Sequence, residues 1–204
     1  MKRFLTPLLA MLITACSLGP VQKDAPAIYD LGAPRSNAVK EPRIRAGVLM
    51  HNVSAPGWLE TPGIVYRLNY QDAARQQTYA NSRWASAPAL LLTQRLRSRL
   101  AAASDGGVIG IADGARADYT LRVELEEFSQ VFDAADSSRG VVIVRASIVN
   151  VSRRAVHAQK SFSVERAAAS ANAEGGVRAL AAAGDDMIEA VVAWAAATLA
   201  QEQK

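Results

Sequence analysis

The chain has 204 residues, half of them hydrophobic, with a single cysteine and a formal net charge of +4. This composition excludes a disordered tail, a collagen and a disulfide scaffold, and the length allows one full domain or at most two small ones. Lys2 and Arg3 lie in a segment that we expect to be removed, which leaves 21 Lys and Arg against 19 Asp and Glu over the 189 residues from Cys16 onward. The resulting net charge of +2 gives no electrostatic case for binding nucleic acid.

The first fifteen residues are typical of an export signal. Lys2 and Arg3 supply positive charge, and an apolar stretch of ten residues, 4–13, follows them. As a helix this stretch would be about 15 Å long, roughly half the hydrocarbon thickness of a bilayer, so it is too short for a permanent membrane span. We therefore predict a cleaved signal peptide over residues 1–15.

Cys16 follows Thr14 and Ala15 directly, and this pattern resembles the bacterial lipobox. We expect signal cleavage to leave Cys16 at the N-terminus with several acyl chains, palmitate among them, because a single chain anchors only marginally. The alternative is a chance cysteine at an ordinary cleavage site. Ser17 follows in place of Asp, which by analogy with sorting in Gram-negative bacteria favours the periplasmic face of the outer membrane. Residues 16–26 are expected to form a flexible tether.

Alternation of apolar and polar side chains predicts six strands in the rest of the chain. The clearest pattern begins at Tyr119, where every second residue is apolar up to Leu125. Two turns, at residues 135–140 and 152–154, would join the last three strands into an antiparallel meander. The expected strands are residues 27–31, 43–51, 64–70, 119–126, 141–151 and 155–164, and residues 107–112 could add a short one.

Two helices are expected. Residues 88–103 begin at a proline, which a first helical turn tolerates, and Ser86 is the expected cap. Three leucines spaced four residues apart form the buried face, and Arg95, Arg97 and Arg99 are expected to point outward. The second helix covers residues 176–200. Its most apolar part is too short for a membrane span and contains a glutamate, so we expect a core helix.

The order of these elements is three strands, a helix, three strands and a helix. With antiparallel hairpins, that order predicts an α+β fold. We expect a single domain over residues 27–204, in which two helices pack on one face of a mostly antiparallel sheet.

The sequence contains no recognisable catalytic or metal-binding motif. It has neither a nucleophile elbow nor a phosphate-binding loop, and its one cysteine is assigned to lipid. His51 and His157 lie on separate expected strands without a companion ligand. We therefore expect no catalytic residue, no metal, no cofactor and no enzyme activity.

Two pairs of carboxylates have structural explanations. Asp185 and Asp186 would lie in the early turns of the second helix, where negative charge favours the helix dipole. Glu124 and Glu126 point the same way on one expected strand and would form its solvent-facing side. Neither pair predicts general acid–base chemistry.

A series of short motifs between residues 29 and 100 resembles a known family. The order and spacing of these motifs are similar to those of the ABC-type transport auxiliary lipoprotein family, the outer-membrane partners of MCE-type lipid-transport systems. The resemblance extends through the strand at Tyr119 and the C-terminal helix. The motifs are Tyr29-Asp30-Leu31-Gly32, residues 44–48, Trp58-Leu59-Glu60, residues 63–67, residues 79–85 and the helix that follows them.

The resemblance implies a non-enzymatic lipoprotein component of an ABC/MCE-type transport system. Such a system moves lipids or hydrophobic compounds across the cell envelope, and this component would dock the conduit at the outer membrane. Its partners would be an MCE-domain protein and the ABC permease and ATPase, and assembly as a homo-oligomer stays open. The alternative is an outer-membrane assembly or scaffolding lipoprotein that does not contact the cargo.

Aromatic residues are dense in the apparently irregular segment before the first helix. Their side chains would either pack in the core, as large aromatics in small domains usually do, or line a partner or oligomer surface, where Tyr, Trp and Arg are enriched. The candidate interface residues are Tyr79, Arg83, Trp84 and Arg75.

Overall fold

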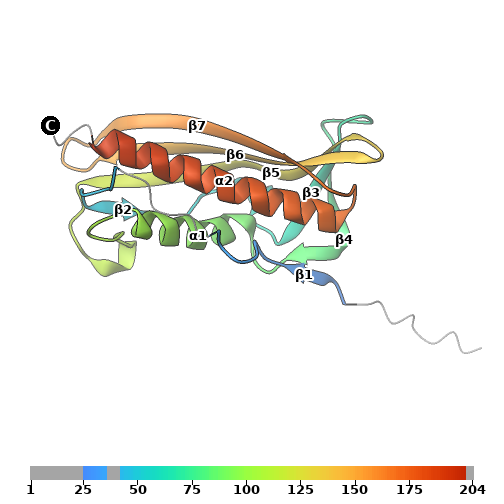
Figure 1. The fold of residues 1–204 in the computed structure, drawn as a ribbon, viewed down its shortest axis with the longest axis horizontal. Helices are drawn as coiled ribbons and strands as arrows, with labels where there is room; N and C mark the ends of the chain where they lie inside the picture. Colours follow the sequence, from blue (N-terminus) through green and yellow to red (C-terminus); the bar gives the residue numbers. More distant parts are fainter. Residues whose placement is uncertain (1–24, 36–41, 201–204) are drawn as a thin grey trace, which may run out of the picture.

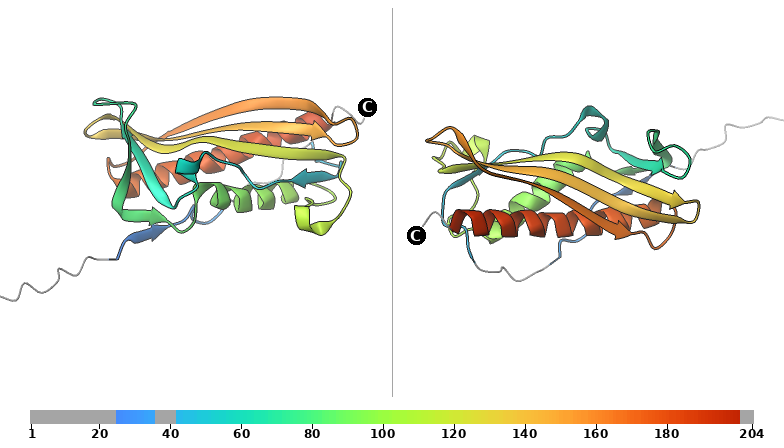
Figure 2. Two further views of the ribbon diagram at one scale, coloured as in Figure 1. Left: turned by 180° about the vertical axis from the view of Figure 1, so that it is seen from behind. Right: turned by 90° about the horizontal axis from the view of Figure 1, so that it is seen from above.

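The computed structural model describes residues 25–35 and 42–200 (Figure 1). The expected signal peptide, Cys16 and most of the expected tether lie outside the described residues. The described part contains seven strands in one sheet and two α-helices on the same face of that sheet, as the view from behind in Figure 2 also shows. This arrangement confirms the expected α+β fold.

The sheet is mixed but mostly antiparallel. Its strand order is β1-β4-β3-β5-β6-β7, and β2 lies beside the first part of β5. The pairs β1–β4, β2–β5 and β3–β5 are parallel. The strands are β1 (Ala27–Tyr29), β2 (Val48–Met50), β3 (Gly63–Leu68), β4 (Gln76–Trp84), β5 (Tyr119–Ala134), β6 (Ser137–Asn150) and β7 (Ala155–Ala167).

The expected meander is confirmed, because β5, β6 and β7 pair antiparallel in sequence order. β5 is twice as long as the strand that the alternation predicted. The alternation breaks after Leu125 because a bulge between Leu125 and Glu127 reverses the faces of the residues that follow, although the strand itself continues. Glu124 and Glu126 do lie on the side of β5 away from the helices. Both pair with Arg145 of β6, and the hydrogen bond that Arg145 donates to Glu124 raises the pKa of that guanidinium.

The segment before the first helix is a strand and not an irregular region. β4 spans nine residues and pairs with β3 on one side and with β1 on the other, so four strands precede the first helix. A register shift between Gly63 and Val65 in the β3–β4 pair interrupts the alternation of β4. The strand is also rich in Gln, Thr, Asn and Ser, and these two properties hid it from the hydrophobic pattern.

The strand expected at residues 43–51 is shorter than predicted, and residues 107–112 form no strand. Residues 43–47 lie outside β2, and Ile44 makes only an isolated bridge with Ser104. Within residues 107–112, Ile109 makes an isolated bridge with Leu49, and a short 3-10 helix, η2 (Ile111–Asp113), follows. A second such turn, η1 (Gly57–Leu59), precedes β3.

Both helices are present and cover the sheet. Helix α1 (Pro88–Ala102) follows Ala87, which makes no side-chain cap, so the expected capping role of Ser86 is wrong. Helix α2 (Ala173–Ala200) begins three residues earlier than predicted, and the Asn172 side chain accepts a hydrogen bond from the Gly175 amide. No helix among residues 25–35 and 42–200 is both long and apolar enough to cross a membrane.

The core lies between the two helices and the sheet. Leucines of α1, Trp84 of β4, inward residues of β5 and β6, and the apolar stripe of α2 are buried there. Gly140 of β6 permits the close approach of α2, because a Cβ at this position would lie 2.7 Å from the backbone nitrogen of Leu180. Gly176 serves the same purpose in α2, where a Cβ would lie 2.0 Å from Gln130 Oε1. The two glycines thus fix the first half of α2 against β5 and β6.

Candidate functional site

Tyr79 of β4 points toward the helix layer. Its hydroxyl donates a hydrogen bond to Gln130 Oε1 at 2.8 Å, and its ring lies 4.6 Å from the ring of Tyr66, centroid to centroid. Burial, with a smaller contribution from Tyr66, raises the pKa of Tyr79 to about 12. A half-buried phenol with an internal acceptor has a structural role.

The acceptor of that hydrogen bond, Gln130, is fully buried and was not singled out by the sequence. Its amide nitrogen donates to Ser138 Oγ at 2.8 Å and to the carbonyl oxygen of Asn172 at 3.2 Å. Gln130 therefore connects β4, β6 and the start of α2. The signal that could have identified Gln130 is a glutamine in the buried second half of β5, with Gly140 of β6 opposite it and Gly176 of α2 against it.

The structure separates the four candidate interface residues. Trp84 is 1% exposed and packs edge-on against Phe128 at 5.5 Å between ring centroids. Of the two alternatives for this side chain, core packing and a partner surface, the structure therefore shows core packing. Arg83 and Arg75 are exposed, and their side chains make no hydrogen bond or ion pair within the described part of the chain. They flank the two ends of β4, about 25 Å apart by strand rise, and do not form one patch.

Arg83 has an apolar neighbour that the sequence did not predict. In the parallel pair β1–β4, Ile28 is in register with Arg83, so both side chains lie on the same face of the sheet. Ile28 is 60% exposed, and β1 has no strand on its other side among the described residues. We call the outer side of β1, with Ile28 and Arg83, the β1 edge.

Next to the β1 edge lies a cavity of about 380 Å³ between β1 and the first turns of α2. Its walls are mainly small and aliphatic. They include Tyr29 and Leu31 from the N-terminal segment, Ala85 after β4, and Val177 and Ala181 from α2.

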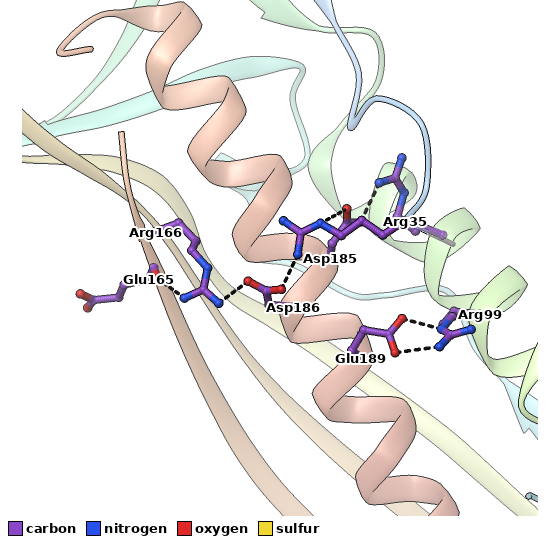
Figure 3. Close-up of polar contacts among 8 residues, drawn as sticks. Arg35, Arg99, Glu165, Arg166, Asp185, Asp186 and Glu189 are labelled. Atoms are coloured by element: carbon purple, nitrogen blue, oxygen red, sulfur yellow. Dashed lines mark hydrogen bonds and ion pairs between the residues drawn. The ribbon is translucent and has the colours of Figure 1, made fainter. Parts of the chain in front are cut away.

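A larger groove of about 620 Å³ lies between α1 and α2, beside residues 30–35. Its walls carry charged side chains in ion pairs. Arg95 Nη1 lies 2.6 Å from Asp185 Oδ1, and Arg99 Nη2 donates to Glu189 Oε2 at 2.9 Å (Figure 3). The expectation that Arg95 and Arg99 point to solvent is therefore wrong, because both face α2.

Asp185 and Asp186 lie in the middle of α2, not in its early turns, so their expected dipole role is wrong. Arg35, in the segment after β1, lies 2.6 Å from Asp186 Oδ1 and 3.6 Å from Asp185 Oδ2. Arg166 of β7 also pairs with Asp186 (Figure 3). Arg95 donates to the carbonyl oxygen of Gly32. These carboxylates thus tie the N-terminal segment, both helices and β7 together.

The complementary spacing of these charges is visible in the sequence. Arg95 and Arg99 are four residues apart on α1, and Asp185 and Glu189 are four residues apart on α2, so each set lies on one helical face. Periodicity within one helix does not show which other helix will lie opposite.

The histidines lie apart. His51 follows β2 and is half-buried, and the ring of His157 on β7 lies 5.5 Å from that of Tyr119. Within residues 25–35 and 42–200, no group of three or more His, Cys, Asp or Glu side chains is placed to hold a metal ion. The charged residues that the described residues bring together are instead the internal ion pairs between α1, α2, β7 and the segment after β1.

A family model described as the ABC-type transport auxiliary lipoprotein component matches residues 29–192, from the end of β1 into the last third of α2. Protein XCC0632 from Xanthomonas campestris has a similar structure, with 19% identity and a TM-score of 0.77 over 87% of this chain and 99% of that chain. An uncharacterized protein has 17% identity and a TM-score of 0.64 over 84% and 99% of the two chains.

The hypothetical protein CT253 from Chlamydia trachomatis has 10% identity and a TM-score of 0.52 over 76% of this chain and 98% of that chain. At these identities the three structures show a shared fold alone. No curated protein matches the chain in sequence.

Proposed function

This chain belongs to the family of ABC-type transport auxiliary lipoprotein components, and on that premise we propose that it serves an ABC/MCE-type system that moves lipids or hydrophobic compounds across the cell envelope. In this proposal the chain is not an enzyme. It docks the conduit of the system at the outer membrane, with its domain on the periplasmic face. Its partners are an MCE-domain protein and the ABC permease and ATPase.

The observation that carries the proposal is the extent of the family match. The match runs from β1 to α2 and so includes every strand and helix of the described domain at least in part. It also begins thirteen residues after Cys16, which lies in a lipobox-like sequence. An anchor and a domain of this family in one short chain favour a component that acts at a membrane surface.

The position of β1 is consistent with docking close to that membrane. β1 lies at one end of the elongated domain, and α2 ends at the other (Figure 1). The nine steps of chain from Cys16 to Ala25 reach about 30 Å at most when fully extended. A lipid at Cys16 would therefore keep the β1 end of the domain near the bilayer.

The character of the larger groove favours docking over carriage of the cargo. Its walls include Arg95, Arg99, Asp185 and Glu189, all held in ion pairs. The groove also has aliphatic walls such as Leu91 and Ile188, but an acyl chain in it would lie against these ionised groups as well, which prefer water or polar partners. We therefore assign the chain a contact role, in which lipid passes through its partners.

Genetic interaction tests the proposal. Strains that lack this gene, the gene for the MCE-domain protein of the same genome, or both are compared for sensitivity to detergents and hydrophobic compounds. A shared pathway predicts that the double deletion is no more sensitive than either single deletion, and that the full chain restores resistance to the single deletion. Additive sensitivity would contradict the proposal.

A further inference from the structure

The backbone of β1 presents hydrogen-bonding groups at an open edge. The carbonyl oxygen of Tyr29 accepts a hydrogen bond from the Ala85 amide at 2.6 Å, so the backbone groups of Tyr29 face β4. Successive residues of a strand direct these groups to opposite sides, which turns the amide and carbonyl of Ile28 outward. No described strand lies there to pair with them. An unpaired edge of this kind is a template for another strand.

The two faces of the β1 edge differ in chemistry. On the face away from the helices, the exposed side chain of Ile28 lies beside Arg83, whose guanidinium has no partner among the described residues. On the helix face lies the cavity of about 380 Å³, lined by Tyr29, Val177 and Ala181 among others. A strand added to β1 would direct alternate side chains to these two faces.

We propose that the β1 edge is a strand-addition site for an extended segment of the partner protein that this lipoprotein docks. One aliphatic side chain of the segment fills the cavity between β1 and α2. The next residue lies on the opposite face beside Ile28, and a carboxylate near it pairs with Arg83. This inference deepens the docking function proposed above and rests on it for the identity of the partner.

The chemistry of the segment follows from the groups that it meets. Val177, Ala181 and Ala85 leave a cavity suited to a branched aliphatic side chain, while the added strand supplies main-chain hydrogen bonds. Arg178 also borders the cavity but is already paired with Glu174. Arg83 is therefore the cation left to recognise a carboxylate, which a guanidinium binds through two parallel hydrogen bonds.

A second copy of this chain fits the β1 edge poorly. If two β1 strands paired across a twofold axis, both Arg83 side chains would lie on one face of a continuous sheet. Ile28 would then face Ile28, and β1 itself, Ala27–Tyr29, carries no carboxylate to pair with either guanidinium. Asp30, which follows β1 and borders the cavity, already accepts a hydrogen bond from the Gly32 amide. The charge at this edge consequently favours an acidic partner over self-association.

Site-specific photo-crosslinking in cells tests the proposal with the full acylated chain. A photo-crosslinking amino acid replaces Ala27, which is exposed at the start of β1, and a control chain carries it at Leu90, which is 46% exposed on α1. Each is combined with Ile28→Pro, which removes the outward amide, or with Ile28→Ala, which removes only the exposed side chain. The expected adduct joins position 27 to an extended segment of the MCE-domain protein.

Ile28→Pro should lower the yield of that adduct at least about tenfold, and Ile28→Ala less than about threefold, because strand addition depends on the backbone. Since proline could disturb folding, the thermal midpoint of each variant is measured. Arg83→Glu serves as a second variant that leaves the backbone intact, and it should also lower the yield about tenfold or more.

The outcomes separate this inference from the proposed function. If Ile28→Pro lowers the yield of an adduct to an extended segment of another protein, strand addition at the β1 edge is supported. The same result contradicts the proposal that the partner is the MCE-domain protein. Four results overturn strand addition: an adduct to a second copy of the chain, an adduct indifferent to both Ile28→Pro and Arg83→Glu, an equal adduct from the control position, or no adduct at position 27. If the chain still binds the MCE-domain protein in any of these four cases, docking itself stands.

Discussion

Arg95 on α1 and Asp185 on α2 form an ion pair of 2.6 Å in which the two side chains are only 13% and 11% exposed. The same pair holds the segment that follows β1, because Arg95 also donates to the Gly32 carbonyl and Asp185 also faces Arg35. One contact thus connects the two helices with the segment nearest the expected tether.

Replacing Asp185 by alanine should lower the free energy of unfolding by about 2–4 kcal/mol. The change leaves Arg95 largely buried without its carboxylate, and breaking a buried pair by removing one partner is strongly destabilising. Urea unfolding measures the loss. The matched control is Glu174→Ala on the same helix, whose pair with Arg178 is exposed and should contribute less than about 0.5 kcal/mol. Equal losses in the two variants would contradict the account.

Gly140→Ala should destabilise the domain by about 2–3 kcal/mol, because its Cβ would overlap the backbone of α2 and force the helix away from β6. Gly184→Ala, within α2, is the control. Its Cβ would meet Leu92 at an ordinary 3.4 Å, and alanine favours a helix over glycine by up to about 1 kcal/mol. We expect Gly184→Ala to be neutral or stabilising in the same unfolding measurement.

The sequence predicts the meander and both helices because their residues alternate or recur with clear periods. Its errors have local causes. The bulge after Leu125 reversed the alternation of β5, and the polar residues of β4 gave no pattern to detect. The predicted start of α2 is three residues too late, because Gly175 and Gly176 have low helix propensity. The expected dipole role of Asp185 and Asp186 has a separate cause of error, because even a helix that begins at residue 176 has completed about two turns before them. They lie in mid-helix, where they bind arginines.

Tyr79→Phe should lower the free energy of unfolding by about 1 kcal/mol near neutral pH, because it removes the hydrogen bond to Gln130. The pH dependence has a definite sign. Tyr79 has a folded pKa of about 12, above the value of 10 in the unfolded chain, so its contribution is fully present below pH 10 and is lost as the pH rises toward 12.

The wild type and Tyr79→Phe should therefore converge in stability between pH 10 and 12. Tyr70→Phe is the control. Tyr70 is 44% exposed, so this variant should change neither the free energy of unfolding near neutral pH nor its dependence on pH. A stability difference between wild type and Tyr79→Phe that stays constant across this range would show that the phenol ionises normally.

Arg83→Ala should weaken capture of the partner without lowering the thermal midpoint, since the side chain is exposed and unpaired among the described residues. Arg75→Ala, at the other end of β4, is the matched control and should leave capture unchanged if the β1 edge is the contact surface. Loss of stability in Arg83→Ala with unchanged capture would place Arg83 in a structural role.

Cys16→Ser should release the chain from membranes. Acylation at this residue is the expected anchor, and several acyl chains are needed for stable attachment. The chain is followed by fractionation after a high-salt wash, with the unsubstituted chain as the control. If the variant still pelleted with membranes, the anchor would lie elsewhere.

The candidate site was less predictable than the fold. Tyr79, Arg83, Trp84 and Arg75 are aromatic or cationic and close in sequence, which predicts that they share one surface. β4 instead directs Trp84 and Tyr79 inward and separates Arg83 from Arg75 by most of its length. The neighbour of Arg83 is Ile28, more than fifty residues away in the sequence, and a parallel pairing of this kind leaves no local signal.

Co-purification from solubilised envelopes tests the central claim most directly. The full acylated chain is tagged at its C-terminus, isolated in mild detergent, and its partners are quantified by mass spectrometry beside a Cys16→Ser control. We expect near-stoichiometric recovery of the MCE-domain protein, accompanied by the permease and ATPase, and a loss of all three in the control. Recovery of outer-membrane assembly proteins without any MCE-domain protein would contradict it.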